Sequence, residues 1–155
     1  MPGYPHNPME REHYSIAAYK NLSLEDRLAL ALKTELTVAE RDCILRHEQW
    51  MQVRCYFARR ADLTAGEIAV LLDGQDHIIR LCIAKRPDLD ASQVARCVRD
   101  RDPNVRYFIA RNSLLETAQR QILLEDTDPL VRRAAAKGPR PARIEGRPGQ
   151  AVLIR

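Results

Sequence analysis

The stretch DRDPNVRYFIARNSLL, residues 100–115, decides the fold, because its central phrase returns at a constant interval along the chain. The phrase reads Val/Ile-Arg-x-x-x-Ala-Arg/Lys, and its successive copies are 26 residues apart. A period of this length is typical of stacked supersecondary units, none of which can bury its apolar face alone. The sequence therefore predicts an all-α fold, a short right-handed α-solenoid of about five two-helix repeats of 26–27 residues. The arginines that mark the repeats are Arg54, Arg80, Arg106 and Arg132, with a degenerate copy at Arg27.

Capping signals divide each repeat into two helices. Before the first helix stands an N-cap candidate, and a Glu or Gln follows three residues later, as in a capping box. These pairs are Thr37 with Glu40, Thr64 with Glu67, Asp90 with Gln93, and Glu116 with Gln119. The second helix begins at an aspartate, followed twice by a proline at the first helical position. These aspartates are Asp76, Asp102 and Asp128.

The phrase Asp-x-Asp-Pro-x-Val-Arg-x-x-x-Ala-Arg-Asn-x-x-Leu at 100–115 resembles the leucine-rich repeat variant family, which belongs with the HEAT-like solenoids. The resemblance is strongest from 73 to 140. It implies a curved scaffold that alternates an α-helix with a shorter helix, and it implies no reaction. One type of family member carries an N-terminal iron–sulfur module held by clustered cysteines. No cysteine precedes Cys43 here, so we expect that module to be absent.

The cysteines occupy positions that hold apolar residues in neighbouring repeats. Cys97, for example, falls in the same column as Ile44 and Leu71. There is no Cys-x-x-Cys pair, and no histidine stands at metal-ligand spacing from a cysteine. Buried, reduced, structural thiols are therefore predicted at Cys43, Cys55, Cys82 and Cys97.

Signals for catalysis are weak. The histidines are dispersed, and the sequence contains neither a Gly-rich phosphate loop nor a nucleophile elbow. We therefore predict no enzyme, with no catalytic, cofactor-binding or metal-binding residues. The alternative is a HEAT-like enzyme that modifies nucleic acid, for which Trp50 and Tyr56 lie near Arg54 and Arg59 in the sequence.

Two basic columns run along the repeats. In the first, each arginine follows an aspartate by four residues, which predicts a structural Asp–Arg ladder. Its pairs are Asp76 with Arg80, Asp102 with Arg106, and Asp128 with Arg132. The second column lacks acidic partners at a constant spacing, which makes it the candidate interaction surface, although a solvated helix end explains it as well. This surface comprises Arg59, Lys85, Arg111 and Lys137, together with Trp50.

Charge and composition set the two ends apart from the repeats. The formal net charge is +4, and residues 137–155 carry all of it, with five basic residues against Glu145. We expect an N-terminal segment at 1–22 that is partly disordered or forms a capping helix, and a helical repeat domain at 23–138. A flexible basic Pro/Gly/Arg tail at 139–155 completes the chain.

The last repeat has no following helix to cover its apolar face, and solenoids need polar units at their ends. Two hypotheses follow. Residues Ala151–Ile154 fold back on the last repeat as a cap, or the uncovered end docks a partner or a second copy, giving a homodimer.

The predicted function is a non-catalytic helical-repeat scaffold or adaptor that binds an unidentified protein partner and needs no cofactor. The alternative is nucleic-acid binding through the second basic column and the basic tail. Because the repeats are neutral in total, the protein partner is preferred. With no apolar run of membrane-spanning length and no visible secretory signal, the expected location is the cytoplasm, without membrane association.

Overall fold

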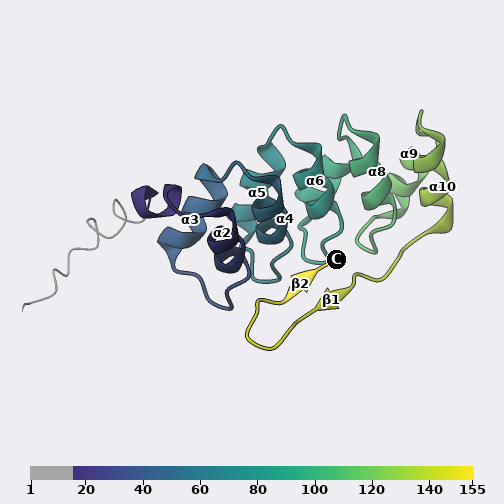
Figure 1. Cartoon of the computed structure of the whole chain (residues 1–155). Coiled ribbons are helices and arrows are strands. Elements are labelled where there is room, and N and C mark those ends of the chain that lie inside the picture. The colour runs from purple at the N-terminus through teal and green to yellow at the C-terminus, as the bar shows by residue number, and fades with distance from the viewer. Residues whose placement is uncertain (1–15) are drawn as a thin grey trace, which may run out of the picture.

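The computed structural model describes residues 16–155, an all-α chain whose helices pack side by side in a row, with one short hairpin at the C-terminal end (Figure 1). Two sets of helices alternate along the sequence. The first helices of the pairs are α3 (Val38–His47), α5 (Ala65–Asp73), α7 (Ala91–Val98) and α9 (Thr117–Leu124). The second helices are α2 (Leu24–Ala31), α4 (Met51–Ala58), α6 (His77–Ala84), α8 (Pro103–Ala110) and α10 (Pro129–Lys137). The predicted all-helical, repeat-like character is confirmed.

The helices begin at the predicted caps. The side chains of Thr37, Thr64 and Asp90 each accept a hydrogen bond from the backbone N–H three residues on, and the Glu or Gln at that position accepts one from the cap residue. At α9 the side chain of Gln119 likewise accepts from the Glu116 N–H, at 3.0 Å. Aspartate side chains cap three second helices, as predicted: Asp76, Asp102 and Asp128.

The core extends along the whole row of helices. Each second helix packs against the next second helix, and first helices pack alongside them. One aliphatic side chain from each of four successive second helices has no exposed surface: Val53, Ile79, Val105 and Val131. Burying such a side chain stabilises a fold by about 1.5–3 kcal/mol. Because each repeat contributes to the same column, its stability depends on its neighbours.

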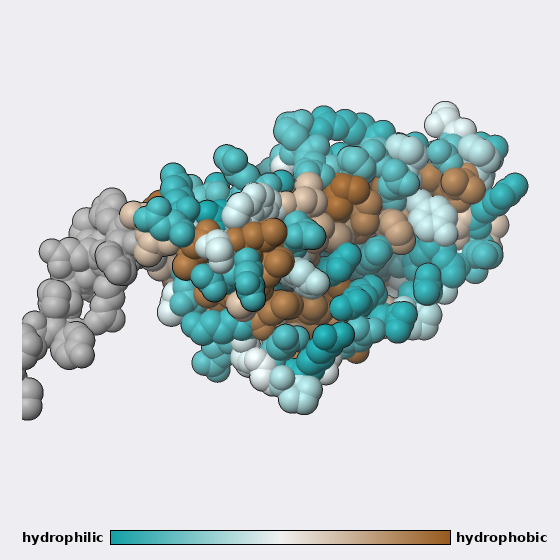
Figure 2. Space-filling view, viewed as in Figure 1, coloured by the Kyte–Doolittle hydropathy of each residue, from teal (hydrophilic) through white to brown (hydrophobic). Residues whose placement is uncertain are grey.

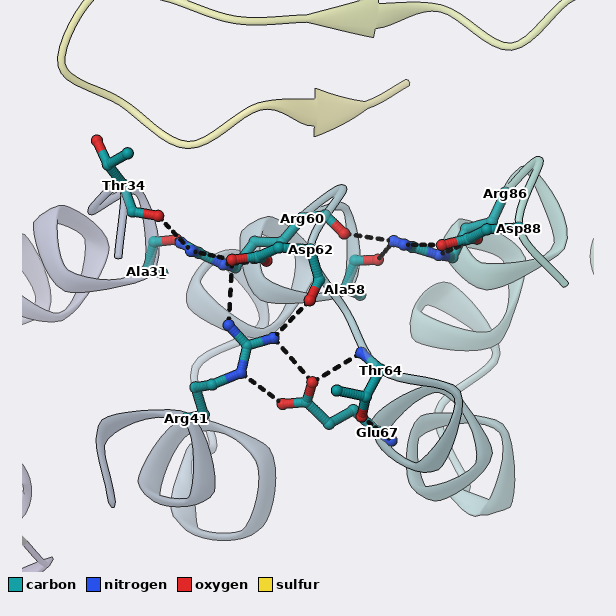
Figure 3. A network of polar contacts seen from close by, with 10 residues as sticks. All are labelled: Ala31, Thr34, Arg41, Ala58, Arg60, Asp62, Thr64, Glu67, Arg86 and Asp88. Carbon is teal, nitrogen blue, oxygen red and sulfur yellow. Dashed lines mark hydrogen bonds and ion pairs between the residues drawn. The ribbon is translucent and has the colours of Figure 1, made fainter. Parts of the chain in front are cut away.

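A column of buried polar side chains, not identified from the sequence, ties each repeat to the one before it (Figure 3). The fully buried Arg86 donates through Nη1 to the carbonyl oxygens of Ala58 and Arg60, at 2.9 and 2.7 Å. Its Nε and Nη2 donate to the two carboxylate oxygens of Asp88, at 2.9 and 2.7 Å. The two carbonyls belong to the C-terminal end of α4, where a helix leaves its last carbonyls without partners.

The same arrangement recurs on either side of Arg86. One repeat earlier, the buried Arg60 donates to the carbonyls of Ala31, Lys33 and Thr34 and to the carboxylate of Asp62. One repeat later, the amide of Asn112 donates to the carbonyls of Ala84 and Arg86, both at 2.9 Å. These side chains therefore bind each repeat to the previous helix end by charge-assisted or amide hydrogen bonds.

The arginine ladder is present, but its acidic partners differ from those predicted. Arg80 pairs with Asp100 and Arg106 with Asp126, each at 2.8 Å and each across 20 residues. Arg132 donates to the backbone carbonyls of residues 126 and 127. The aspartates four residues before the arginines instead cap their own helices through short side-chain bonds to backbone N–H groups. Those aspartates are Asp76, Asp102 and Asp128.

Gly74 interrupts this ladder. It stands 26 residues before Asp100, where the ladder requires a carboxylate. Among residues 16–155, only Asp76 lies within ion-pair distance of Arg54, at 3.8 Å. The backbone of Gly74 has φ −68°, which any L-residue adopts. We expect Gly74→Asp to raise the free energy of unfolding by about 1 kcal/mol, because it supplies the missing partner of Arg54 and restricts the unfolded chain.

The measurement is urea denaturation of the variant, with Gly74→Ala as the matched control for the backbone effect. A Cβ at position 74 would lie 3.3 Å from the Leu71 carbonyl oxygen, so both variants require the same small shift. If Gly74→Asp is no more stable than Gly74→Ala, the position is not a gap in the ladder.

The C-terminal segment is not the flexible tail expected from composition. After α10 the chain reverses and lies along the C-terminal ends of the second helices as a hairpin, in which β1 (Ile144–Glu145) pairs antiparallel with β2 (Leu153–Ile154) (Figure 1). Gly138 and Gly149 lie at its two changes of direction, both with positive φ, a conformation that favours glycine.

The hairpin docks on the early repeats and not on the last one. The N–H groups of Ala151 and Ile154 donate to the carbonyls of Leu32 and Arg59, at 2.9 and 2.7 Å. The Ala61 N–H donates to the Val152 carbonyl, at 2.9 Å. The side chains that the tail buries are Ala151, Leu153 and Ile154. Residues 151–154 therefore fold back over the loops that follow α2 and α4, and the prediction that they cover the last repeat is wrong.

The two ends of the row differ. The prediction for residues 1–22 lies partly outside the described residues, since 1–15 are not described. Residues 16–20 are helical, and the buried Tyr19 donates its hydroxyl to Glu48. At the other end Ile122 and Leu130 stay largely exposed, so the homodimer remains a prediction. Within residues 16–155, no helix combines the length and apolar character that crossing a membrane requires.

Candidate functional site

The tail borders a hollow of about 200 Å³ above the C-terminal ends of α6 and α8. Lys85, Phe108 and Arg111 come from these two helix ends, residues 140–143 from the outgoing part of the tail, and Arg155 from its end. We call this the basic hollow. It is the place where repeats and tail contribute charged side chains to one site.

Backbone hydrogen bonds hold the tail over this place. The Arg140 N–H donates to the Arg111 carbonyl at 2.7 Å, and the Arg111 guanidinium donates to the Gly138 carbonyl. Arg143 and Arg155 exchange two backbone hydrogen bonds, at 3.1 and 2.7 Å. The outgoing and returning parts of the tail are thereby joined to each other and to the end of α8.

The charge around the hollow is strongly unbalanced. Five side chains that line it are cationic: Lys85, Arg111, Arg140, Arg143 and Arg155. Two of them, Arg143 and Arg155, form ion pairs with Glu145, at 3.2 and 3.0 Å. Among the described residues, no carboxylate lies within ion-pair distance of the other three. The hollow therefore has a surplus of positive charge that an anion would neutralise.

Lys85 is the cation most affected by these surroundings. Its Nζ lies 4.2 Å from the centroid of the Phe108 ring, a cation–π contact. Burial lowers the pKa of Lys85 more than Cys82 raises it, and the positive charges of Arg59 and Arg140 lower it further. Both effects oppose the charged form of Lys85, so a bound anion would relieve the repulsion among these cations.

The helix ends offset part of this positive field. Lys85 and Arg111 are the C-caps of α6 and α8, where the helix dipole places about half a negative charge. This dipole stabilises the first cation at each helix end. It does not balance Arg140, which comes from the tail, so the surplus originates in the docking of the tail.

The predicted interaction surface is only partly brought together. Lys85 and Arg111 line the basic hollow, Arg59 lies beneath β2, and Lys137 is exposed at the end of α10. Trp50 is the N-cap of α4, at the opposite end of the second helices, where its ring stacks on Arg27 at 4.6 Å. Figure 2 shows hydrophilic residues along the tail and apolar residues between the helices above it. Three members of the second column, Arg59, Lys85 and Arg111, are therefore half-buried, and Lys137 is exposed.

The cations of the basic hollow that no sequence pattern indicates are those of the tail. Arg140, Arg143 and Arg155 appear in the sequence as a basic composition, without spacing that points to a site. The buried Arg60 and Arg86 were missed as well, although both stand in an Arg-x-Asp phrase, 26 residues apart. That phrase is a signal that the sequence could have supplied.

None of the four cysteines, all of which lie within residues 16–155, forms a disulfide, and Cys43, Cys82 and Cys97 are buried whereas Cys55 is half-buried. Within the described part of the chain, no three His, Cys, Asp or Glu residues gather in a group that could hold a metal ion.

Comparison with models of known protein families, with curated proteins and with solved structures finds no match. The class of protein that fold and site define is thus an all-helical repeat protein with a basic hollow.

Proposed function

We propose that the chain is a short right-handed α-solenoid of the HEAT-like type, and a non-catalytic scaffold that binds a protein partner through the basic hollow. The partner supplies an acidic segment, whose carboxylates enter the hollow. The observation that supports this most directly is a set of three cations around one hollow, Lys85, Arg111 and Arg140, none of which has a carboxylate partner among residues 16–155.

The size of the hollow favours a peptide over a nucleic acid. At about 200 Å³ it admits one or two acidic side chains. A nucleic-acid backbone needs a row of cations that follows its phosphates. Here the cations surround a single point, while Lys137 and Trp50 lie elsewhere, so the charges do not follow a path. Electrostatic recognition of this kind contributes specificity and a fast association rate.

The test is the affinity for a fluorescein-labelled oligoglutamate peptide, measured by fluorescence anisotropy. We expect the double variant Lys85→Glu/Arg140→Glu to weaken binding about tenfold or more, equivalent to about 1.4 kcal/mol, since two attractions become repulsions. The matched control is Arg99→Glu, an exposed arginine at the C-cap of α7, next to the N-terminal ends of the second helices. That control should bind like the wild type.

Three outcomes would contradict the proposal. The peptide fails to bind the wild type, the control variant loses as much affinity as the double variant, or an oligoglutamine peptide binds equally well. A single-stranded oligonucleotide serves as the competing probe. If it binds more tightly than the peptide, with affinity that falls steeply as salt rises and is lost in the double variant, the nucleic-acid alternative replaces the protein partner.

A further inference from the structure

The C-terminal tail, residues 138–155, is held mainly at its two ends. It leaves α10 at Gly138, the C-cap of that helix, and its terminal part is anchored by the buried side chains of Ala151, Leu153 and Ile154. Between these ends, from 139 to 150, no side chain is buried. The position of the tail therefore depends on a small anchor, residues 151–154.

We expect this anchor to open more easily than the repeats unfold. Three backbone hydrogen bonds join residues 151–154 to the loops that follow α2 and α4. A second helix, by contrast, packs against its neighbours and contributes to one core that extends along the row. Segments with few buried apolar contacts open at a lower free energy than the whole fold. The tail can therefore leave and return while the repeats stay folded.

The basic hollow is complete only while the tail is docked. Lys85 and Arg111 come from the helix ends, whereas Arg140 and Arg155 reach the same place with the tail. Arg143 and Arg155 exchange two backbone hydrogen bonds, at 3.1 and 2.7 Å, which join the outgoing part of the tail to its anchored end. Undocking of the anchor therefore withdraws the tail's cations and leaves two cations on the surface of the repeats.

Docking of the tail also brings like charges together. Among residues 16–155, no carboxylate lies within ion-pair distance of Lys85, Arg111 or Arg140. The pKa of Lys85 is lowered mainly by burial, and the charge of Arg140 adds to this effect. Repulsion among these cations opposes docking, whereas a carboxylate placed between them would be attracted by all three.

We propose that the C-terminal tail is a clamp, whose docking and the binding of an acidic segment in the basic hollow stabilise each other. This inference rests on the proposed function, because the acidic segment is the ligand of the clamp. If the segment binds the docked form more tightly, it must also shift the tail toward the docked form by the same factor. Release of the tail would therefore also release the partner.

The first experiment measures the affinity of the full chain for the labelled oligoglutamate peptide by fluorescence anisotropy. We expect Ile154→Asp, which undocks the anchor, to weaken binding about tenfold or more, although the hollow's cations are all unchanged. The matched control is Ile144→Asp on β1, which introduces the same charge at an exposed position and should bind about as tightly as the wild type. Circular dichroism at the same temperature checks that the repeats of both variants stay helical.

The second experiment measures amide hydrogen exchange of the wild type by nuclear magnetic resonance, with and without saturating peptide. The N–H groups of Ala151 and Ile154 donate to the carbonyls of Leu32 and Arg59, so they exchange when the anchor opens. We expect the peptide to slow their exchange by about the factor by which Ile154→Asp weakens binding. The control is the N–H of Leu22, before α2, which donates to the Tyr19 carbonyl and should be unaffected.

Arg140→Gln distinguishes a clamp from a tail that the Arg140 side chain merely holds in place. Without peptide, the Ile154 amide should exchange more slowly than in the wild type, because the repulsion between Arg140 and Lys85 is gone. The same variant should nevertheless bind the peptide more weakly. A side chain that only held the tail would have the opposite effect on exchange when removed.

The outcomes separate this proposal from the proposed function. If the wild type and Ile154→Asp bind the peptide equally well, the clamp is overturned and the acidic-segment site stands. The clamp alone is also overturned if saturating peptide leaves the exchange of the Ile154 amide unchanged, or if Arg140→Gln speeds that exchange. Failure of the wild type to bind the peptide would overturn both.

Discussion

Replacing Arg86 by methionine should lower the free energy of unfolding by about 3 kcal/mol, one of the two largest effects that we expect for this chain. Methionine fills a similar volume and carries no donors. Among the described residues, the carbonyl of Ala58 would then stay buried without a partner, and that of Arg60 would keep only the long hydrogen bond from the Leu63 N–H, at 3.4 Å. Leaving each buried acceptor unsatisfied costs about 1–3 kcal/mol.

Asp88 contributes less to this loss, because its side chain is 38% exposed and water can solvate it once Arg86 is gone. The measurement is urea denaturation followed by circular dichroism. Arg99→Met is the matched control, since Arg99 is exposed, and it should change the stability by less than about 0.5 kcal/mol. Equal stabilities of the two variants would show that the buried arginines do not hold the repeats together.

Undocking the tail should have the second large effect. We expect Ile154→Asp to lower the free energy of unfolding by about 2 kcal/mol, since a charge cannot remain at a position that is 4% exposed. Releasing the tail also exposes Leu153 and breaks the hydrogen bonds to Leu32 and Arg59. The freed segment regains conformational entropy, which offsets part of the loss.

Ending the chain after Gly138 should give a loss of similar size, because it removes the same contacts. The control is Ile144→Asp on β1, where the side chain is 59% exposed, and it should be nearly neutral. Thermal unfolding of the three variants measures how much the docked tail stabilises the fold. Unchanged stability of both Ile154→Asp and the shortened chain would mean that the tail does not dock.

The helices could be predicted from the sequence because their signals are local. A cap such as Thr64 and its partner Glu67 lie three residues apart, and the capping box forms within one helix turn. The repeat spacing then aligned the core columns without any knowledge of the contacts. The helix pairs could therefore be predicted, with helix ends located to within about one or two residues.

The partners of the ladder and the position of the tail could not be predicted in the same way. Arg80 reaches Asp100 in the next repeat, and a spacing rule within one helix instead selected Asp76, which caps its own helix. The tail has the Pro, Gly and Arg content of a disordered segment. It is held by loop carbonyls such as that of Arg59, which become accessible only after the repeats have stacked.

Only part of the basic hollow could be predicted from the sequence, because the tail reaches it only after the chain has folded. Lys85 and Arg111 share a column that the period reveals, whereas Arg140 joins them only through the folding of the tail. Trp50 was grouped with them by proximity to Arg54 and Arg59 in the sequence. It begins α4, however, and Arg59 ends it, so the helix separates the two.

Binding of an acidic segment in the basic hollow is tested most directly by amide chemical shifts of the isotope-labelled full chain during titration with the oligoglutamate peptide. We predict saturable shifts at Lys85, Arg111 and Arg140, which line the hollow, and none at Arg99 or Trp50, near the N-terminal ends of the second helices. Shifts confined to those ends, or no saturable shifts at the three cations, would contradict the proposed function.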